Sequence, residues 1–198
     1  MDPWGHFKTI TKHKMLVMKY CFRIGLYKQG LLHDLSKYSP TEFIQGCKYY
    51  QGFRSPNNAE REDTGVSLAW LHHKGRNRHH YEHWVDYSLD TEKVIMGAKM
   101  PRRYVAEMIM DRISASRNYL GEEAYNDQQP LAYYMKSKEK LWFIHPETKR
   151  DLEALLRILA DHGEKKLLHY IKYVYLKDEH CAAYNALQCV KRYFKKEQ

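Results

Sequence analysis

The chain has 198 residues, of which 43% are hydrophobic, so it fits a single compact domain with a buried core and not a disordered segment. Lysine and arginine outnumber aspartate and glutamate by 33 to 24, and the net charge of +9 favours anionic partners such as phosphate esters, nucleotides or nucleic acid. The four cysteines form no CxxC pair, and no signal peptide or membrane-spanning stretch is evident, so we expect a soluble, cytoplasmic protein without a zinc ribbon and without a membrane partner.

The first half of the chain reads as helices separated by short breaks. Apolar residues at helical spacing predict a helix over 7–25 that ends at Gly25, followed by a short helix over 26–38. The next helix is expected to start at Ser39, with Pro40 in the first turn and Glu42 closing a capping box. The polar stretch 51–63 predicts a loop, and residues 64–74 predict a helix that ends at Gly75.

The second half continues this helical pattern. Residues 79–84 are expected to form a turn of helix, and Pro101 opens a strongly periodic helix that ends at Gly121. We expect 121–140 to be irregular and a helix with a leucine stripe to run from Pro146 to near Gly163. One or two further helical stretches should fill 164–195. No alternating strand pattern is present, so the predicted fold class is all-α.

Three residues near the N-terminus are candidates for metal chemistry. His13 lies on the apolar stripe of the first helix, where a histidine is either a core residue or a ligand. His33 and Asp34 are adjacent, so an imidazole and a carboxylate can converge on one divalent ion, although such a pair also makes ordinary hydrogen bonds at helix ends. Lys37 is one predicted turn beyond His33 and either contacts a substrate phosphate or is a surface lysine near a helix C-terminus.

The middle of the chain supplies further candidates. Five histidines fall between positions 72 and 83, and we expect one member of each doublet to be a ligand, with His73 and His83 in a solvated loop. Asp111 lies mid-helix beside small residues that leave room for an ion or a substrate. A buried carboxylate is costly unless it is paired, so the alternative is a salt bridge from Asp111 to Arg103 or Arg117.

Taken in chain order, these residues resemble the HD-domain superfamily, whose signature is a histidine, a His-Asp doublet and a distal aspartate on helices. The matching segments are His13, HDLSK at 33–37, HHKGRNRHH at 72–80 and DR at 111–112. More narrowly, the set HDLSKYSPTEF, HHKGRNRHHYEHW, DRISAS and HPET is similar, over roughly 10–165, to an uncharacterised family of bacterial and phage proteins classed as a domain of unknown function. The resemblance implies an HD-like helical bundle over 1–165, with 166–198 as a C-terminal helical extension packed on it.

The resemblance also implies a ligand set for one or two divalent ions. His13, His33, Asp34 and Asp111 would hold the first ion, and Asp34 would bridge to a second ion held by His72 and either His79 or His80. Mixed imidazole and carboxylate ligation suits Fe, Mn, Co, Ni or Zn better than Ca.

The implied activity is that of a phosphohydrolase, a phosphomonoesterase or phosphodiesterase that acts on a nucleotide or cyclic nucleotide through metal-activated water. Asp34 would orient the attacking oxygen, while Lys37, Arg112 or Arg117 would neutralise the phosphate. Two alternatives remain: an HD-type diiron oxygenase that uses the same ligands, and a non-catalytic module that binds a nucleotide or nucleic acid through the net charge and the basic tail.

Overall fold

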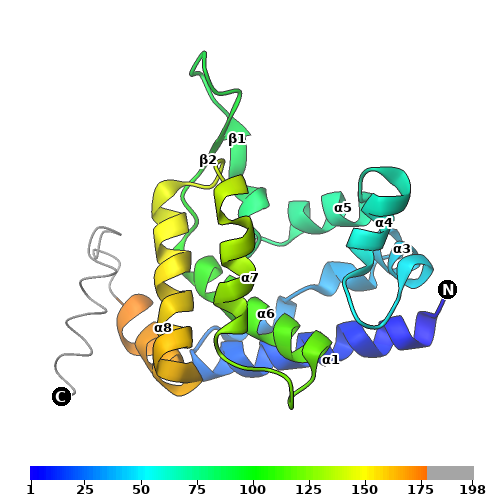
Figure 1. Cartoon of the computed structure of the whole chain (residues 1–198), viewed down its shortest axis with the longest axis horizontal. Helices are drawn as coiled ribbons and strands as arrows, with labels where there is room; N and C mark the ends of the chain where they lie inside the picture. The colour runs from blue at the N-terminus through cyan, green and yellow to red at the C-terminus, as the bar shows by residue number, and fades with distance from the viewer. Residues whose placement is uncertain (178–198) are drawn as a thin grey trace.

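The computed structural model describes residues 1–177, which are mostly helical and include one small antiparallel hairpin (Figure 1). The prediction of a helical fold is thereby confirmed. The α-helices in this part of the chain are α1 (Pro3–Arg23), α2 (Tyr27–Leu32), α3 (Pro40–Tyr49), α4 (Pro56–Thr64), α5 (Leu68–Arg76), α6 (Arg102–Leu120), α7 (Gln129–Ser137) and α8 (Pro146–Tyr170). Short 3-10 helices cover Leu35–Tyr38, Tyr81–Trp84 and Lys138–Lys140.

The core lies where α1, α6 and α8 meet. Val17 of α1, Ile109 and Ile113 of α6, and Leu152 and Leu156 of α8 are completely buried in one apolar cluster. In Figure 1, α1 runs along one edge of the molecule, α7 and α8 stand side by side, and α3, α4 and α5 gather at the opposite end. Helix α6 passes between these two groups, and its Ile109 and Ile113 belong to the core.

Three elements differ from the sequence prediction. The segment expected to be a loop over 51–63 contains α4, and the segment expected to be irregular over 121–140 contains α7. Strands β1 (Val85–Tyr87) and β2 (Ile95–Gly97) pair antiparallel, with Val85 opposite Gly97, and their hairpin projects from the helices (Figure 1). Three-residue strands are too short to produce a recognisable alternation, and α4 buries only Ala59 and Glu60, so it has no apolar stripe.

The predicted break near Gly163 is present within α8. Gly163 has non-helical torsions (φ 81°, ψ 167°) and separates a first helical stretch from a second one that runs to Tyr170 and is followed by a π-helical turn over Ile171–Tyr175, as expected for the start of 164–195. The buried Leu167 and Ile171 belong to the same core cluster as the first part of α8. The rest of the predicted C-terminal extension, 178–198, lies outside the described residues. None of the helices in 1–177 combines the length and apolar character that a membrane span needs.

Gly97 provides a test of how the hairpin is anchored. A β-carbon at this position would overlap the backbone of Phe143 and His145, which cannot move aside as a side chain can. We expect Gly97→Ala to destabilise the protein by about 1–3 kcal/mol through overpacking, measured by thermal or urea unfolding. Gly75→Ala is the control, because open space surrounds Gly75 within α5, and it should leave stability unchanged or increase it. Equal stability of the two variants would contradict the close packing at Gly97.

Candidate metal centre

The backbone between α2 and the following 3-10 helix brings two adjacent side chains into the interior. Helix α2 ends at Leu32, and Asp34 adopts a left-handed conformation (φ 54°), alone among the non-glycine residues of 1–177. Aspartate tolerates this region better than most residues. Lys14 of α1 donates hydrogen bonds from Nζ to the carbonyl oxygens of Leu31 (2.6 Å) and His33 (3.2 Å), which holds the turn against α1. As a result, the side chains of His33 and Asp34 are both buried.

The first ligand group combines this turn with α1 and α6. Its members are His13, His33, Asp34 and Asp111, which offer donor atoms within 4.8 Å of one another. His13 Nε2 lies 3.0 Å from Asp111 Oδ1 and 3.6 Å from Asp34 Oδ2. His33 Nε2 lies 3.4 Å from the same Asp34 oxygen. Two imidazoles and two carboxylates thus converge, and this is the set that the resemblance implied for a first ion.

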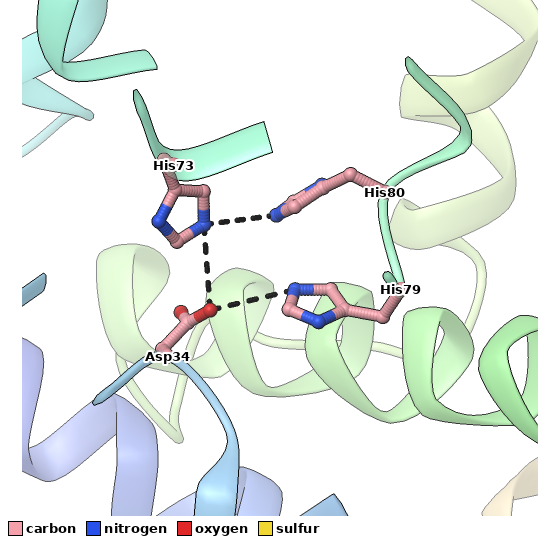
Figure 2. A group of neighbouring side chains, drawn as sticks. All are labelled: Asp34, His73, His79 and His80. Carbon is pink, nitrogen blue, oxygen red and sulfur yellow. Dashed lines mark hydrogen bonds and ion pairs between the residues drawn. The ribbon is translucent and has the colours of Figure 1, made fainter. Parts of the chain in front are cut away.

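The second group combines Asp34 with the end of α5 and the segment after it. Figure 2 shows His73, His79 and His80 directed toward one another and toward Asp34. Nε2 of His73 lies 3.3 Å from Asp34 Oδ1 and 3.0 Å from Nε2 of His80, and Nε2 of His79 lies 3.4 Å from Asp34 Oδ1. Two nitrogens bound to one ion at about 2.1 Å and at a right angle are about 3.0 Å apart, so the His73–His80 spacing fits shared ligation.

Asp34 belongs to both groups, and each of its carboxylate oxygens faces a different one. Oδ2 is the oxygen near His13 and His33, whereas Oδ1 is the oxygen near His73 and His79. A carboxylate with this arrangement can bridge two cations. The geometry therefore provides two adjacent cation positions with one shared ligand.

Two buried glutamates orient the histidines from outside. His33 Nδ1 lies 2.9 Å and His79 Nδ1 3.3 Å from Oε1 of Glu107 on α6. On the other side, Nδ1 of His73 lies 2.8 Å from Oε2 of Glu42 on α3. Donation from Nδ1 to a carboxylate leaves the lone pair of a neutral imidazole on Nε2, the usual arrangement for histidines that bind metals. Both glutamates were missed in the sequence.

Glu42 also corrects the expected start of α3. Ser39 makes no side-chain capping bond, and the Glu42 carboxylate turns inward to histidines instead of closing a capping box. Its other oxygen, Oε1, accepts a hydrogen bond from Nδ1 of His72 at 2.6 Å. The structure therefore places His73, which we expected to be solvated, in the second ligand group, and His72 outside both groups.

Several donor atoms in the two groups are orphaned. Nε2 of His13, His33 and His79 and Oδ1 of Asp34 are buried and make no hydrogen bond within residues 1–177; their nearest polar neighbours are other donor atoms of the two groups. Buried polar atoms without partners cost about 1–3 kcal/mol each, and a bound cation would satisfy all of them together. The residues present therefore fit a metal centre, and their nitrogen and oxygen donors suit a divalent transition metal.

The pKa values of several ligand residues are shifted by burial and by neighbouring charges. Burial opposes ionisation of Asp34, but the charges of His33, Lys37 and His73 outweigh it and hold the pKa of Asp34 well below its usual value. Burial lowers the pKa of His80 well below that of a free histidine, so His80 is neutral at neutral pH. Burial would also lower the pKa of His33, but the neighbouring carboxylates, led by Asp34, raise it to about 9.

The raised pKa of His33 predicts how metal binding depends on pH. A cation at Nε2 must displace the proton that His33 carries below about pH 9, so binding releases this proton. Metal affinity should therefore rise by about one decade per pH unit from pH 6 to pH 8. Competition titrations with a chelator of known affinity would measure this slope. A flat profile over this range would contradict the release of a proton from His33 on metal binding.

The two groups border a cavity of about 200 Å³ whose lining includes Lys37, Trp70 and Tyr119. Lys37 Nζ lies 2.6 Å from Asp34 Oδ2. We expected Lys37 to share a helical face with His33, but this was wrong. Helix α2 ends at Leu32, and Lys37 lies on the 3-10 helix that follows. Burial disfavours a charged lysine, but Asp34 and Asp111 raise the pKa of Lys37, so it remains a cation at the cavity wall.

The structure does not bring the other expected phosphate-binding residues to this cavity. Arg117 forms ion pairs with Glu122 and Glu164, its Nη2 lying 2.9 Å from Oε2 of Glu164, and its guanidinium stacks over Tyr125. Arg112 does not line the cavity either. His83 Nδ1 contacts the carbonyl oxygen of Lys74 at 3.2 Å and belongs to neither ligand group.

Fold and site together define a mostly helical protein with buried histidine–aspartate clusters that can hold metal ions. The chain belongs to the family of unknown function DUF5662, whose model matches residues 2–158. This agrees with the expected similarity to an uncharacterised family. No curated protein and no solved structure gives a significant match to the chain.

Proposed function

We propose that this protein is a metal-dependent phosphohydrolase with two divalent transition-metal ions. The observation that carries the proposal is Asp34, whose two carboxylate oxygens each face a separate group of histidines. One carboxylate shared between two ions is the arrangement that two-metal hydrolases use. The order of His13, the His33-Asp34 doublet and Asp111, which resembles the HD-domain signature, supports the same reading.

The ligands we propose follow the two groups. His13, His33, Asp34 and Asp111 hold one ion, while Asp34, His73, His79 and His80 hold the other. When bound, the two ions supply Lewis acidity that lowers the pKa of water and offsets phosphate charge. Asp34 fixes the separation of the two positions, and Glu107 and Glu42 keep the lone pairs of the histidines directed inward.

The cavity supports a phosphate ester of a nucleotide or cyclic nucleotide as the substrate. Lys37 presents a cation at the wall, where it can neutralise a phosphate oxygen as charge shifts toward the leaving group. Trp70, Tyr50 and Tyr119 supply aromatic faces for a base. The net charge of +9 favours the approach of an anion.

The test begins with metal analysis. The protein is purified without added metal and its bound metals are quantified by mass spectrometry beside the His33→Ala/Asp34→Ala variant. Two equivalents of a transition metal, lost in the variant, followed by turnover in a screen of phosphomonoesters and phosphodiesters, are the expected results. Turnover that persists in the variant would contradict the proposal.

Other outcomes would point to the alternative functions. Two equivalents of iron with oxygen uptake and no phosphoester hydrolysis would point to the diiron oxygenase. No metal in either protein after reconstitution would leave a binding module, and steeply salt-dependent binding to a nucleotide or nucleic acid would then support it.

A further inference from the structure

A second cavity, of about 360 Å³, lies against the outer side of the histidine pair His33 and His79. It shares no lining residue with the cavity described above. Three separate segments form it: α2 with the residue after it, the stretch that joins the end of α5 to His79, and the first turns of α6. His33, His79 and Glu107 of the metal centre line this cavity, but neither proposed metal position lies in it and the proposed reaction does not use it.

Four cations converge on this cavity from those segments. They are Lys28, Arg76, Arg78 and Arg103, and all four are exposed. None forms an ion pair with a carboxylate within residues 1–177. Glu107 is the acidic residue of the lining, but it is buried and already accepts hydrogen bonds from His33 and His79. The cavity wall therefore carries a local excess of positive charge.

Several arginines elsewhere in the described chain do have carboxylate partners. Arg23 and Arg117 pair with Glu164, Arg54 pairs with Glu62, and Arg157 pairs with Glu153. Like charges held together without counter-ions repel one another, so the arrangement gains stability when an anion enters.

Tyr104 organises two of the arginines. Arg78 Nη1 donates a hydrogen bond to the Tyr104 hydroxyl at 3.4 Å, and the guanidinium of Arg103 lies 5.0 Å from the centre of the Tyr104 ring. Gln29 Nε2 donates to the carbonyl oxygen of Arg103 at 3.1 Å and ties α2 to α6 at this point. Guanidinium groups held in this way present paired N–H donors that match the oxygens of a phosphate.

A cation is a poorer occupant of the same place. His33, His79 and Glu107 are close enough to form a third ligand group. However, Nε2 of both histidines faces Asp34, and four positive side chains surround the opening. The repulsion from these side chains would oppose a further divalent ion, whereas it favours an anion.

We propose that this cavity binds the phosphate group of a phosphate ester or polyphosphate, at a site separate from the metal centre. Arg76, Arg78 and Arg103 bind the phosphate oxygens, and Lys28 adds charge at the entrance. The site does not depend on the proposed hydrolase activity.

Tripolyphosphate is the first probe, titrated calorimetrically into the full-length protein as purified. The variant Arg76→Gln/Arg78→Gln/Arg103→Gln should bind it at least tenfold more weakly. The matched control Arg54→Gln/Arg150→Gln/Arg157→Gln removes the same charge elsewhere and should change the affinity less than twofold. Equal weakening in both variants, or no binding to the unmodified protein at millimolar concentrations, would overturn the proposal.

Two further arms separate this site from the metal centre and identify the source of the phosphate. Asp34→Asn should retain tripolyphosphate affinity within twofold, and loss of affinity in this variant would show instead that the probe binds at the metals. Displacement of tripolyphosphate by a nucleoside triphosphate supports a small-molecule ligand, and displacement by a short single-stranded oligonucleotide supports a nucleic-acid backbone. Failure of both to compete would overturn the assignment to phosphate esters.

Discussion

Asp34→Asn should lose most of its bound metal and nearly all of its hydrolytic activity. The substitution removes the charge from the one side chain that faces both ligand groups, with Oδ2 near His33 and Oδ1 near His79. Removing one partner of a buried charged pair costs about 3–5 kcal/mol, which is roughly a 10²- to 10⁴-fold loss of affinity for each ion. Metal content by mass spectrometry and initial rates with the best substrate of the screen would measure both effects.

Asparagine is the appropriate replacement because it tolerates the left-handed backbone that Asp34 adopts. The fold should therefore persist, and circular dichroism would verify it. Asp63→Asn serves as the control, since Asp63 is an exposed residue of α4 that accepts a hydrogen bond from Tyr49. Retention of two ions and of full activity in Asp34→Asn would refute the bridging role.

Glu107→Gln should lower the metal affinity of both positions, although Glu107 itself is a proposed ligand of neither ion. Glu107 Oε1 lies near Nδ1 of His33 and of His79, which belong to different ligand groups. An amide accepts these hydrogen bonds less strongly, so both imidazoles lose basicity and orientation. Loss of such an outer partner costs about 10–100-fold in metal affinity or activity. Metal titration should show both steps weakened, and added metal should restore part of the rate.

The comparison for Glu107→Gln is Glu42→Gln. Glu42 contacts His73, which belongs to the second ligand group, and His72, which belongs to neither group. Only one of the two metal-binding steps should therefore weaken. Glu62→Gln, on the exposed side of α4, should alter neither step. If Glu107→Gln affected only one ion, the shared outer contact would not act as described.

The periodic helices could be predicted from the sequence because burial forces their pattern. Val105, Ile109 and Ile113 in α6 and Leu152, Leu155 and Leu159 in α8 pack into the core, and their spacing is visible in the sequence. Helix α4 buries only Ala59 and Glu60, and the short helix α7 buries only Pro130 and Tyr134 fully, so neither has an apolar pattern long enough to predict a helix. No solved structure matches the chain, so the HD-like arrangement of the bundle stays a prediction.

The sequence predicted only some of the site residues, and the reason is geometric. Adjacent residues on a helix point about 100° apart, so choosing between His72 and His73 requires the rotation of α5 about its axis. Glu107 precedes Asp111 by four residues and therefore shares its face, a signal that could have been used. Glu42 could not have been recognised, because a glutamate three residues after a serine is typical of an ordinary helix start.

The positions of the ligands have a mechanical consequence. Helices α4 and α5 both pack on α3, and this group meets the rest of the described chain mainly through α1 and the 3-10 helices at Leu35–Tyr38 and Tyr81–Trp84 (Figure 1). The second ligand group spans this boundary, because His73 comes from α5 while Asp34 follows α2 and also belongs to the first group. Metal bound at the centre would hold α3–α5 against the rest of the described chain. Without bound metal, we expect α3–α5 to open at lower free energy than the core of α6 and α8, so that its amides exchange hydrogen sooner.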